Sequence, residues 1–183
     1  MANKIVILNG SPRKNGNTST LVRAFADGAR EAGADVREFF LDGMDIGGCK
    51  GCFGGGREGG CPCVQKDGMA EIYPAYRDAD VVVLASPLYY WNISGQLKTA
   101  FDRLFAVAEC DSDYRNPIKE SALLMAAEGN GFEESVYWYD RLMVHLGWKS
   151  HGKVLCGGVM GLGDIEGRKE IEEARQLGAR AAV

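Results

Sequence analysis

The chain contains 183 residues, of which 46% are hydrophobic and 25% are charged, and its formal net charge is −4 at pH 7. These values are ordinary for a soluble globular protein, and the excess of acidic residues argues against a general nucleic-acid-binding surface. The sequence has no apolar run of the about 20 residues that a membrane span needs, so we expect no membrane association. The amino-terminal segment lacks the layout of a signal peptide, and we therefore expect one cytoplasmic domain over residues 1–183.

Apolar runs alternate with helical patterns along the chain. Lys4–Asn9 is a short continuous apolar run, which is typical of a strand that is buried on both faces. Five strands alternating with five helices predict an α/β fold, with a doubly wound parallel sheet and helices on both faces. Ligands then bind beyond the carboxyl ends of the strands. The other predicted strands are Asp35–Leu41, Val81–Ser86, Ser121–Ala127 and Lys153–Met160, and the predicted helices are Thr18–Ala32, Gly68–Ala79, Ser94–Ala108, Phe132–Leu146 and Gly167–Ala182.

The loop after the first predicted strand is rich in groups that bind anions. It reads GSPRKNGNTST from Gly10 to Thr20, and the next helix begins near Thr18. The unpaired backbone N–H groups and the dipole of that helix point at the loop, which predicts a phosphate site. The spacing matches neither the G-x-x-x-x-G-K-[ST] loop of nucleotide triphosphatases nor the G-x-G-x-x-G dinucleotide fingerprint. The alternative is a helix cap with a solvated basic turn, because Ser, Thr and Asn cap helices routinely.

The loop after the third predicted strand places three aromatic residues in succession. It reads SPLYYWNISGQLK from Ser86 to Lys98. Exposed aromatic side chains are costly unless they face a ligand or a partner. Such a loop can supply the apolar walls and backbone N–H groups that a flat heteroaromatic ring needs. The alternative is a patch at a subunit interface, and the two interpretations are compatible.

The two motifs GSPRKNGNTSTLV and VVVLASPLYYWNISGQLKTAFDRL together resemble the NADPH-dependent FMN reductase and iron–sulfur flavoprotein branch of the flavodoxin-like superfamily. The resemblance covers nearly the whole chain. It implies a flavodoxin-like three-layer sandwich with strand order 2-1-3-4-5, FMN at the ends of strands one, three and four, and a homodimer or homotetramer. The phosphate-binding residues that it implies are Ser11, Arg13, Asn17, Thr18 and Ser19, and those bordering the ring and ribityl chain are Pro87, Leu88, Tyr89, Tyr90 and Trp91, with Gly129 in the loop 127–131 completing the pocket.

A glycine- and cysteine-rich loop spans residues 43–68. Relatives of the iron–sulfur type carry C-x-x-C-x-x-C and a fourth cysteine shortly afterwards. Here Cys49 and Cys52 match, Cys63 matches the fourth position, the third falls on Gly55, and Cys61 is an extra thiol that could replace the missing ligand. Four thiolates can hold a [4Fe–4S] cluster or zinc, but the spacing C-x2-C-x8-C-x-C is odd for either. We therefore expect no metal, and instead a loop of reduced thiols that covers the flavin or a subunit contact.

These features predict an enzyme that passes electrons from NAD(P)H through bound FMN to an acceptor. The acceptor is expected to be a quinone, a nitro compound, a metal ion or a protein. The flavin carries this chemistry, so no catalytic side chain is predicted. One alternative is a flavodoxin-like or iron–sulfur flavoprotein electron carrier that does not oxidise NAD(P)H directly. A second alternative is a binding or sensing protein that has kept the fold and changed the ligand.

Overall fold

The computed structural model describes residues 3–57 and 61–183, which form strands and helices in alternation. The first strand ends at Asn9, where the polar Gly10–Gly16 loop begins, and the first helix starts directly after that loop. The strands are β1 (Lys4–Asn9), β2 (Asp35–Phe40), β3 (Val81–Pro87), β4 (Glu120–Ala126) and β5 (Lys149–Cys156). The helices are α1 (Asn17–Glu31), the 3₁₀ turn η1 (Leu41–Gly43), α2 (Met69–Asp78), α3 (Gly95–Arg103), α4 (Phe105–Ala108), α5 (Glu133–Leu146) and α6 (Lys169–Ala181).

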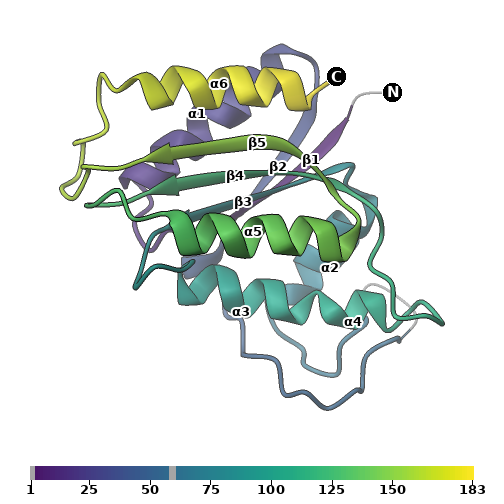
Figure 1. Ribbon diagram of the computed structural model, residues 1–183. Coiled ribbons are helices and arrows are strands. Elements are labelled where there is room, and N and C mark those ends of the chain that lie inside the picture. Colours follow the sequence, from purple (N-terminus) through teal and green to yellow (C-terminus); the bar gives the residue numbers. More distant parts are fainter. Residues whose placement is uncertain (1–2, 58–60) are drawn as a thin grey trace.

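The strands form one five-stranded sheet in the order β2-β1-β3-β4-β5, and all neighbouring pairs are parallel. Helices α1 and α6 cover one face of the sheet, and α2, α3 and α5 cover the other (Figure 1). This arrangement confirms the predicted strand order and the flavodoxin-like three-layer sandwich. The strand order changes direction between β1 and β3, because the chain goes from β1 to β2 on one side and from β3 to β4 and β5 on the other. This is the switch point where ligands bind in sheets of this kind.

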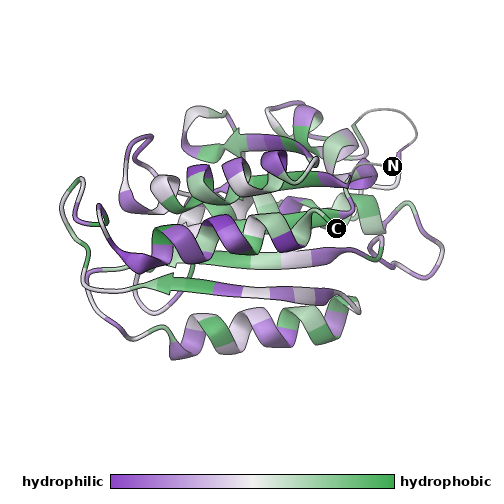
Figure 2. Cartoon of the chain, turned by 90° about the horizontal axis from the view of Figure 1, so that it is seen from above, coloured by the Kyte–Doolittle hydropathy of each residue, from purple (hydrophilic) through white to green (hydrophobic). Residues whose placement is uncertain are grey.

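Side-chain alternation along β1 divides the core into two halves. Ile5 and Ile7 pack toward α1 and α6, whereas Val6 and Leu8 pack toward α2 and α3. All four side chains are buried, as expected for a strand that is covered on both faces. The covering helices show mixed hydrophilic and hydrophobic segments in Figure 2, because each of them buries only one side. None of the helices in the described parts of the chain is long and apolar enough to cross a membrane.

Helices α1 and α6 approach each other unusually closely through two glycines. A Cβ atom on Gly28 would lie 2.0 Å from the carbonyl oxygen of Arg175, and one on Gly178 would lie 2.0 Å from the carbonyl oxygen of Phe25. Only glycine leaves room for backbone-to-backbone contact at these two positions. The contact fixes α1, the helix whose amino end faces the predicted phosphate site.

The structure corrects two predicted boundaries. The last strand runs over Lys149–Cys156 rather than over the predicted 153–160, because Gly147 ends α5 in a left-handed conformation (φ 64°) and the chain extends two residues later. Its carboxyl end is set by Gly157 and Gly158, and Gly158 has a φ of 74°. The helix predicted over 94–108 is divided into α3 and α4, because Leu104 N–H bonds to Phe101 in a tighter 3₁₀-type turn.

Candidate functional site

A cavity of about 230 Å³ opens at the carboxyl ends of β1, β3, β4 and β5. It brings together loops that are far apart in the sequence, as the switch-point rule predicts for a parallel sheet. Seven of the predicted site residues line it: Ser11, Arg13, Asn17, Thr18, Pro87, Leu88 and Tyr89.

The amino end of α1 forms the floor of this cavity. Gly16 precedes the helix in an extended conformation and offers no side-chain cap. The N–H of Thr20 is the first to bond along the helix, to Gly16 at 3.0 Å. The backbone N–H groups of Asn17, Thr18 and Ser19 therefore precede the regular helical bonding and are available to an anion.

The loop before α1 is held in shape by its own hydroxyl groups. The hydroxyls of Ser11 and Ser19 both donate to the carbonyl oxygen of Arg13, at 3.0 and 2.9 Å. Asn9 accepts the N–H of Ser11 at 3.0 Å and donates to Ser19 at 3.1 Å. Ser19 is buried and does not line the cavity, so its direct contact with a phosphate stays a prediction, and its hydroxyl here supports the loop.

Two residues of this loop reach across to the loop after β5. Asn17 donates its side-chain N–H to the carbonyl oxygen of Gly161 at 2.9 Å, and Arg13 donates to that of Met160 at 3.2 Å. The side-chain oxygen of Asn17 is buried and has no hydrogen-bond partner among the described residues. A buried acceptor without a donor is costly, so this atom is suited to accept a hydrogen bond from a hydroxyl group of a bound ligand.

The aromatic loop after β3 is a tight turn. Tyr89 and Asn92 exchange backbone hydrogen bonds at 2.9 and 3.1 Å, and the two residues between them, Tyr90 and Trp91, have φ angles of 47° and 61°. Positive φ at both central positions is the geometry of a type I′ turn, which Gly, Asn and Asp normally fill. Two bulky residues in this conformation are strained, and such strain is characteristic of functional sites.

The turn directs its aromatic rings differently. Tyr89 is partly exposed and lines the cavity, whereas Tyr90 is 94% exposed and Trp91 is 60% exposed, both outside the lining. The Trp91 carbonyl accepts the hydroxyl of Ser135 at 2.9 Å, which ties the turn to α5. Contact of Tyr90 and Trp91 with a bound ring stays a prediction, since both side chains are exposed and neither lines the cavity.

The loops after β4 and β5 complete the cavity wall. Glu128 lines the cavity, whereas the neighbouring Gly129, which the resemblance implied, does not. Val159 and Met160 also line it, and sequence reasoning missed both. The signal was available, because the loop after β5 emerges at the same sheet edge as the loops after β1, β3 and β4, but both residues fall inside the predicted strand Lys153–Met160.

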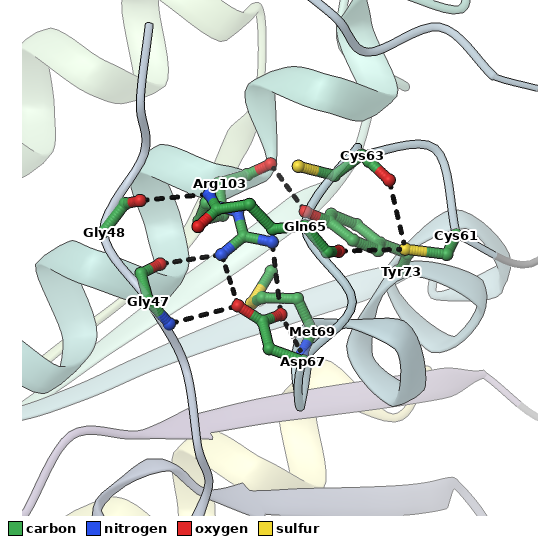
Figure 3. Close-up of polar contacts among 9 residues, drawn as sticks. All are labelled: Gly47, Gly48, Cys61, Cys63, Gln65, Asp67, Met69, Tyr73 and Arg103. Atoms are coloured by element: carbon green, nitrogen blue, oxygen red, sulfur yellow. Dashed lines mark hydrogen bonds and ion pairs between the residues drawn. The ribbon is translucent and has the colours of Figure 1, made fainter. Parts of the chain in front are cut away.

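The loop 43–68, which carries four cysteines, lies on the opposite side of the sheet from α1, beneath α3 and α4 (Figure 1). Cys49 and Cys52 are exposed, and Cys61 and Cys63 are partly buried. Figure 3 shows the Cys61 sulfur facing the carbonyl oxygens of Cys63 and Gln65, at 3.6 and 3.7 Å. Within residues 3–57 and 61–183, no group of three or more His, Cys, Asp or Glu side chains is placed to hold a metal ion.

Comparison with known proteins identifies a family that this chain matches and curated relatives that are similar to it. A family model described as NADPH-dependent FMN reductase matches residues 3–156. An iron-sulfur flavoprotein of Archaeoglobus fulgidus is 32% identical over 188 residues, which cover 98% of this chain and 79% of the relative. An iron-sulfur flavoprotein of Methanosarcina thermophila is 31% identical over 158 residues, which cover 84% of this chain and 77% of the relative.

Solved structures show the same fold. An NAD(P)H:quinone oxidoreductase from Methanothermobacter marburgensis superimposes with a TM-score of 0.74 at 18% identity, covering 98% of this chain and 97% of that chain. An FMN-dependent NADH-azoreductase from Bacillus anthracis, in complex with FMN, superimposes with a TM-score of 0.72 at 16% identity, covering 99% and 100%. At these identities the likeness establishes the architecture alone.

Proposed function

The chain belongs to the NADPH-dependent FMN reductase family, and from this premise we propose that it binds FMN in the cavity at the carboxyl ends of β1, β3 and β4 and transfers electrons from NAD(P)H to an acceptor. The observation that carries the proposal is the meeting of two loops in one cavity. The phosphate loop before α1 and the aromatic loop after β3 were each predicted to bind one end of FMN, and residues from both line the same space.

The amino end of α1 is suited to the phosphate of FMN. The N–H groups of Asn17, Thr18 and Ser19 supply neutral donors and the positive end of a helix dipole. Arg13 adds a guanidinium at the cavity wall, and the hydroxyl of Thr18 adds a further donor. The unpartnered side-chain oxygen of Asn17 is suited to a ribityl hydroxyl rather than to the phosphate, because a phosphate dianion has no proton to donate.

The loop after β3 is suited to the flavin ring. Pro87, Leu88 and Tyr89 offer an apolar wall on one side of the cavity. The backbone N–H of Leu88 donates to the carbonyl oxygen of Ala126 at 3.0 Å, which fixes this wall against β4. Tyr90 and Trp91 extend the wall beyond the cavity, where they would limit the access of water to the ring.

The protein groups position the cofactor and adjust its electrostatic surroundings. Bound FMN would supply the redox chemistry, which is the transfer of electrons from a nicotinamide to an acceptor. Glu128 brings a carboxylate to the cavity wall and would disfavour a build-up of negative charge beside it. Arg13 at the wall of the same cavity would favour such charge, so the balance between these two side chains would tune the reduction potential.

The direct test is anaerobic mixing of the FMN-loaded protein with NADH or NADPH while the yellow flavin absorbance is recorded. Rapid bleaching is the expected result. A flavin that stays yellow with both nicotinamides, but is reduced by a one-electron donor, would favour the electron carrier, a function consistent with the iron-sulfur flavoprotein names of the relatives. A protein that takes up no FMN would overturn both assignments. If the flavin is bleached, addition of a quinone, a nitro compound or ferric iron identifies the acceptor, because the true acceptor restores the yellow absorbance.

We also propose that the protein works as a homodimer or homotetramer. Several large apolar side chains are exposed in the single chain, among them Tyr90, Trp91 and Tyr137. Tyr90 and Trp91 directly follow Tyr89, which lines the cavity, so a second copy that covers them would shield the flavin there. Light scattering on the FMN-loaded protein tests this proposal, and a monomer at micromolar concentration would contradict it.

A further inference from the structure

A second cavity, distant from the flavin site, collects three of the four loop cysteines. Its volume is about 60 Å³, and Cys49, Cys52 and Cys63 line it, together with Arg103 at the end of α3. The fourth thiol, Cys61, is not part of the lining and donates instead to backbone carbonyl oxygens of its own loop. The cavity therefore holds a set of thiols that the proposed flavin chemistry does not use.

The residues of this cavity do not fit an iron–sulfur cluster. Position 55, where a third cysteine ligand would follow Cys49 and Cys52, is glycine, and the space that a side chain there would take is already filled. A Cβ atom on Gly55 would lie 1.9 Å from a carboxylate oxygen of Glu109 and 3.1 Å from the Cα atom of Ala106 in α4. A carboxylate and a helix backbone thus occupy the place of the missing ligand.

Arg103 supplies a buried positive charge at the cavity wall. Its side chain is 1% exposed, and its two terminal nitrogens bind the carboxylate of Asp67 at 2.7 and 3.1 Å, as Figure 3 shows. The third guanidinium nitrogen, Nε, is buried and has no hydrogen-bond partner among the described residues. A buried donor without an acceptor indicates that this wall is built to meet an anion or a strongly polar group.

Cys63 stands beside this charge. Burial alone would raise the pKa of the Cys63 thiol, but the N–H of Gln65, the hydroxyl of Tyr73 and the charge of Arg103 together lower that pKa below its usual value. In Figure 3 the Cys63 sulfur lies on the Arg103 side, apart from the Cys61 sulfur. A thiol that hydrogen bonds and a cation stabilise as thiolate is the reactive type of cysteine.

Cys52 is the thiol best placed to pair with Cys63. The segment that carries Cys52 packs against the segment that carries Cys63, because a Cβ atom on Gly54 would be 2.8 Å from a methyl carbon of Val64, the residue after Cys63, and 3.4 Å from the Cys52 sulfur. Gly51 before Cys52, and Gly54 after Phe53, give this segment the freedom to close a bond. Cys49 lines the same cavity without this proximity to the Cys63 segment.

We propose that Cys63 and Cys52 form a thiol–disulfide site that a hydroperoxide oxidises. The Cys63 sulfur attacks one peroxide oxygen, so that an S–O bond forms and the O–O bond breaks. The Cys52 sulfur then attacks the Cys63 sulfur, an S–S bond forms and the S–O bond breaks. In total two thiols and one hydrogen peroxide give one disulfide and two waters; the sulfurs lose two electrons and the peroxide gains them.

The experiment uses the full chain, reduced and then treated with one equivalent of hydrogen peroxide before the free thiols are alkylated. Peptide mass mapping is expected to show a disulfide between Cys52 and Cys63, while Cys49 and Cys61 remain alkylated. Cys63 is expected to react faster than exposed Cys49, because the thiolate is the reactive form of a cysteine and the surroundings of Cys63 favour it. In Cys52→Ser, dimedone is expected to trap a sulfenic acid on Cys63.

The matched control is Cys49→Ser, which removes another thiol of the same cavity and is expected to leave disulfide formation unchanged. A disulfide that links Cys63 to Cys49 or Cys61, or an equal oxidation rate in Cys63→Ser, would overturn the proposal. So would stoichiometric uptake of iron and sulfide by the reduced chain on reconstitution, because a cluster would engage the same thiols. Neither flavin nor nicotinamide takes part, so this result is independent of the proposed electron transfer.

Discussion

The hydroxyl of Ser94 donates to the carbonyl oxygen of Gly10 at 2.8 Å and joins the two loops that carry the proposed flavin site. The hydroxyl oxygen of Ser94 also accepts the N–H of Leu97 at 3.3 Å and so caps the amino end of α3. Gly10 is tightly enclosed, since a Cβ atom on it would lie 2.6 Å from the Ser94 oxygen. One small side chain therefore starts a helix and sets the separation between the phosphate loop and the aromatic loop.

Ser94→Ala is expected to lower both stability and flavin affinity. Loss of the cap should cost about 1 kcal/mol of unfolding free energy, measured by urea denaturation. Release of the two loops should weaken FMN binding about tenfold, which corresponds to about 1.4 kcal/mol in a fluorescence titration. Ser112→Ala, at an exposed position away from the cavity, is the matched control. Unchanged FMN affinity in Ser94→Ala would mean that the loops hold their positions without this contact.

Thr18→Ala and Asn17→Ala are expected to weaken FMN retention while the fold survives. Each variant removes a polar side chain at the cavity floor. A hydrogen bond from Thr18 to the charged phosphate should contribute about 1.5–3 kcal/mol, and one from a ribityl hydroxyl to Asn17 about 0.5–1.5 kcal/mol. Comparison with riboflavin locates the effect, because Thr18→Ala should weaken FMN binding more than riboflavin binding if its hydroxyl holds the phosphate. Thr99→Ala on α3 is the control. Equal losses of FMN and riboflavin affinity in Thr18→Ala would place the phosphate elsewhere.

Tyr90→Gly is expected to stabilise the flavin-free protein. Tyr90 has a φ of 47° and is 94% exposed, so glycine relieves backbone strain and removes little packing. The left-handed conformation costs a non-glycine residue about 1–2 kcal/mol, of which the greater flexibility of glycine offsets a part. A gain of about 1 kcal/mol should raise the unfolding temperature by about 2–4 °C in calorimetry. A lower unfolding temperature would show that Tyr90 makes a stabilising contact.

Asp67→Asn is expected to destabilise the protein at neutral pH and to change its response to acid. Burial would raise the pKa of the Asp67 carboxyl, but Arg103 and the N–H groups of Gly47 and Met69 lower it overall. A folded-state pKa below the unfolded value of about 3.9 stabilises the fold at higher pH, and this contribution is lost as pH falls through that range. The substitution leaves Arg103 without its buried partner, which should cost about 3–5 kcal/mol at pH 7.

Urea denaturation at pH 7 and pH 3 checks this expectation, and the difference between wild type and Asp67→Asn should shrink at the lower pH. The control is Asp111→Asn. The pKa of Asp111 is also lowered, by the N–H groups of Asp113 and Arg115, but this side chain is on the surface, where ion pairs contribute little. A stability gap that stays constant between the two pH values would rule out the Asp67 carboxylate as the source of the effect.

Local sequence predicted the framework of the molecule well. Buried apolar runs such as Lys4–Asn9 and 81–86 carry the strand signal within themselves, and the motif resemblance supplied the strand order. Chain order then sufficed to bring the loops after β1 and β3 to one edge. The predicted boundary of β5 was wrong because its position depends on the cap at Gly147 and on pairing with β4, which local pattern does not contain.

The candidate site was predictable only in part, because its finer features arise from contacts between distant residues. The hydrogen bond from Asn17 to Gly161 holds the loop after β5 next to the cavity, and no periodic pattern in either segment predicts this bond. The buried pair of Arg103 and Asp67 is of the same kind, since each residue alone resembles an ordinary surface charge. The sequence pattern therefore indicates which loops meet at the sheet edge. The pairing of side chains between distant residues decides which polar groups of each loop remain free to bind a ligand.

The glycine contact between α1 and α6 joins two segments that are synthesised at different times. Gly28 is translated well before Gly178, yet each is fitted against the backbone of the other's helix. During translation, the helix whose amino end is proposed to hold the phosphate therefore lacks the lateral support of α6 until α6 itself has left the ribosome. Cofactor capture should accordingly follow the emergence of α6 rather than accompany the synthesis of the phosphate loop.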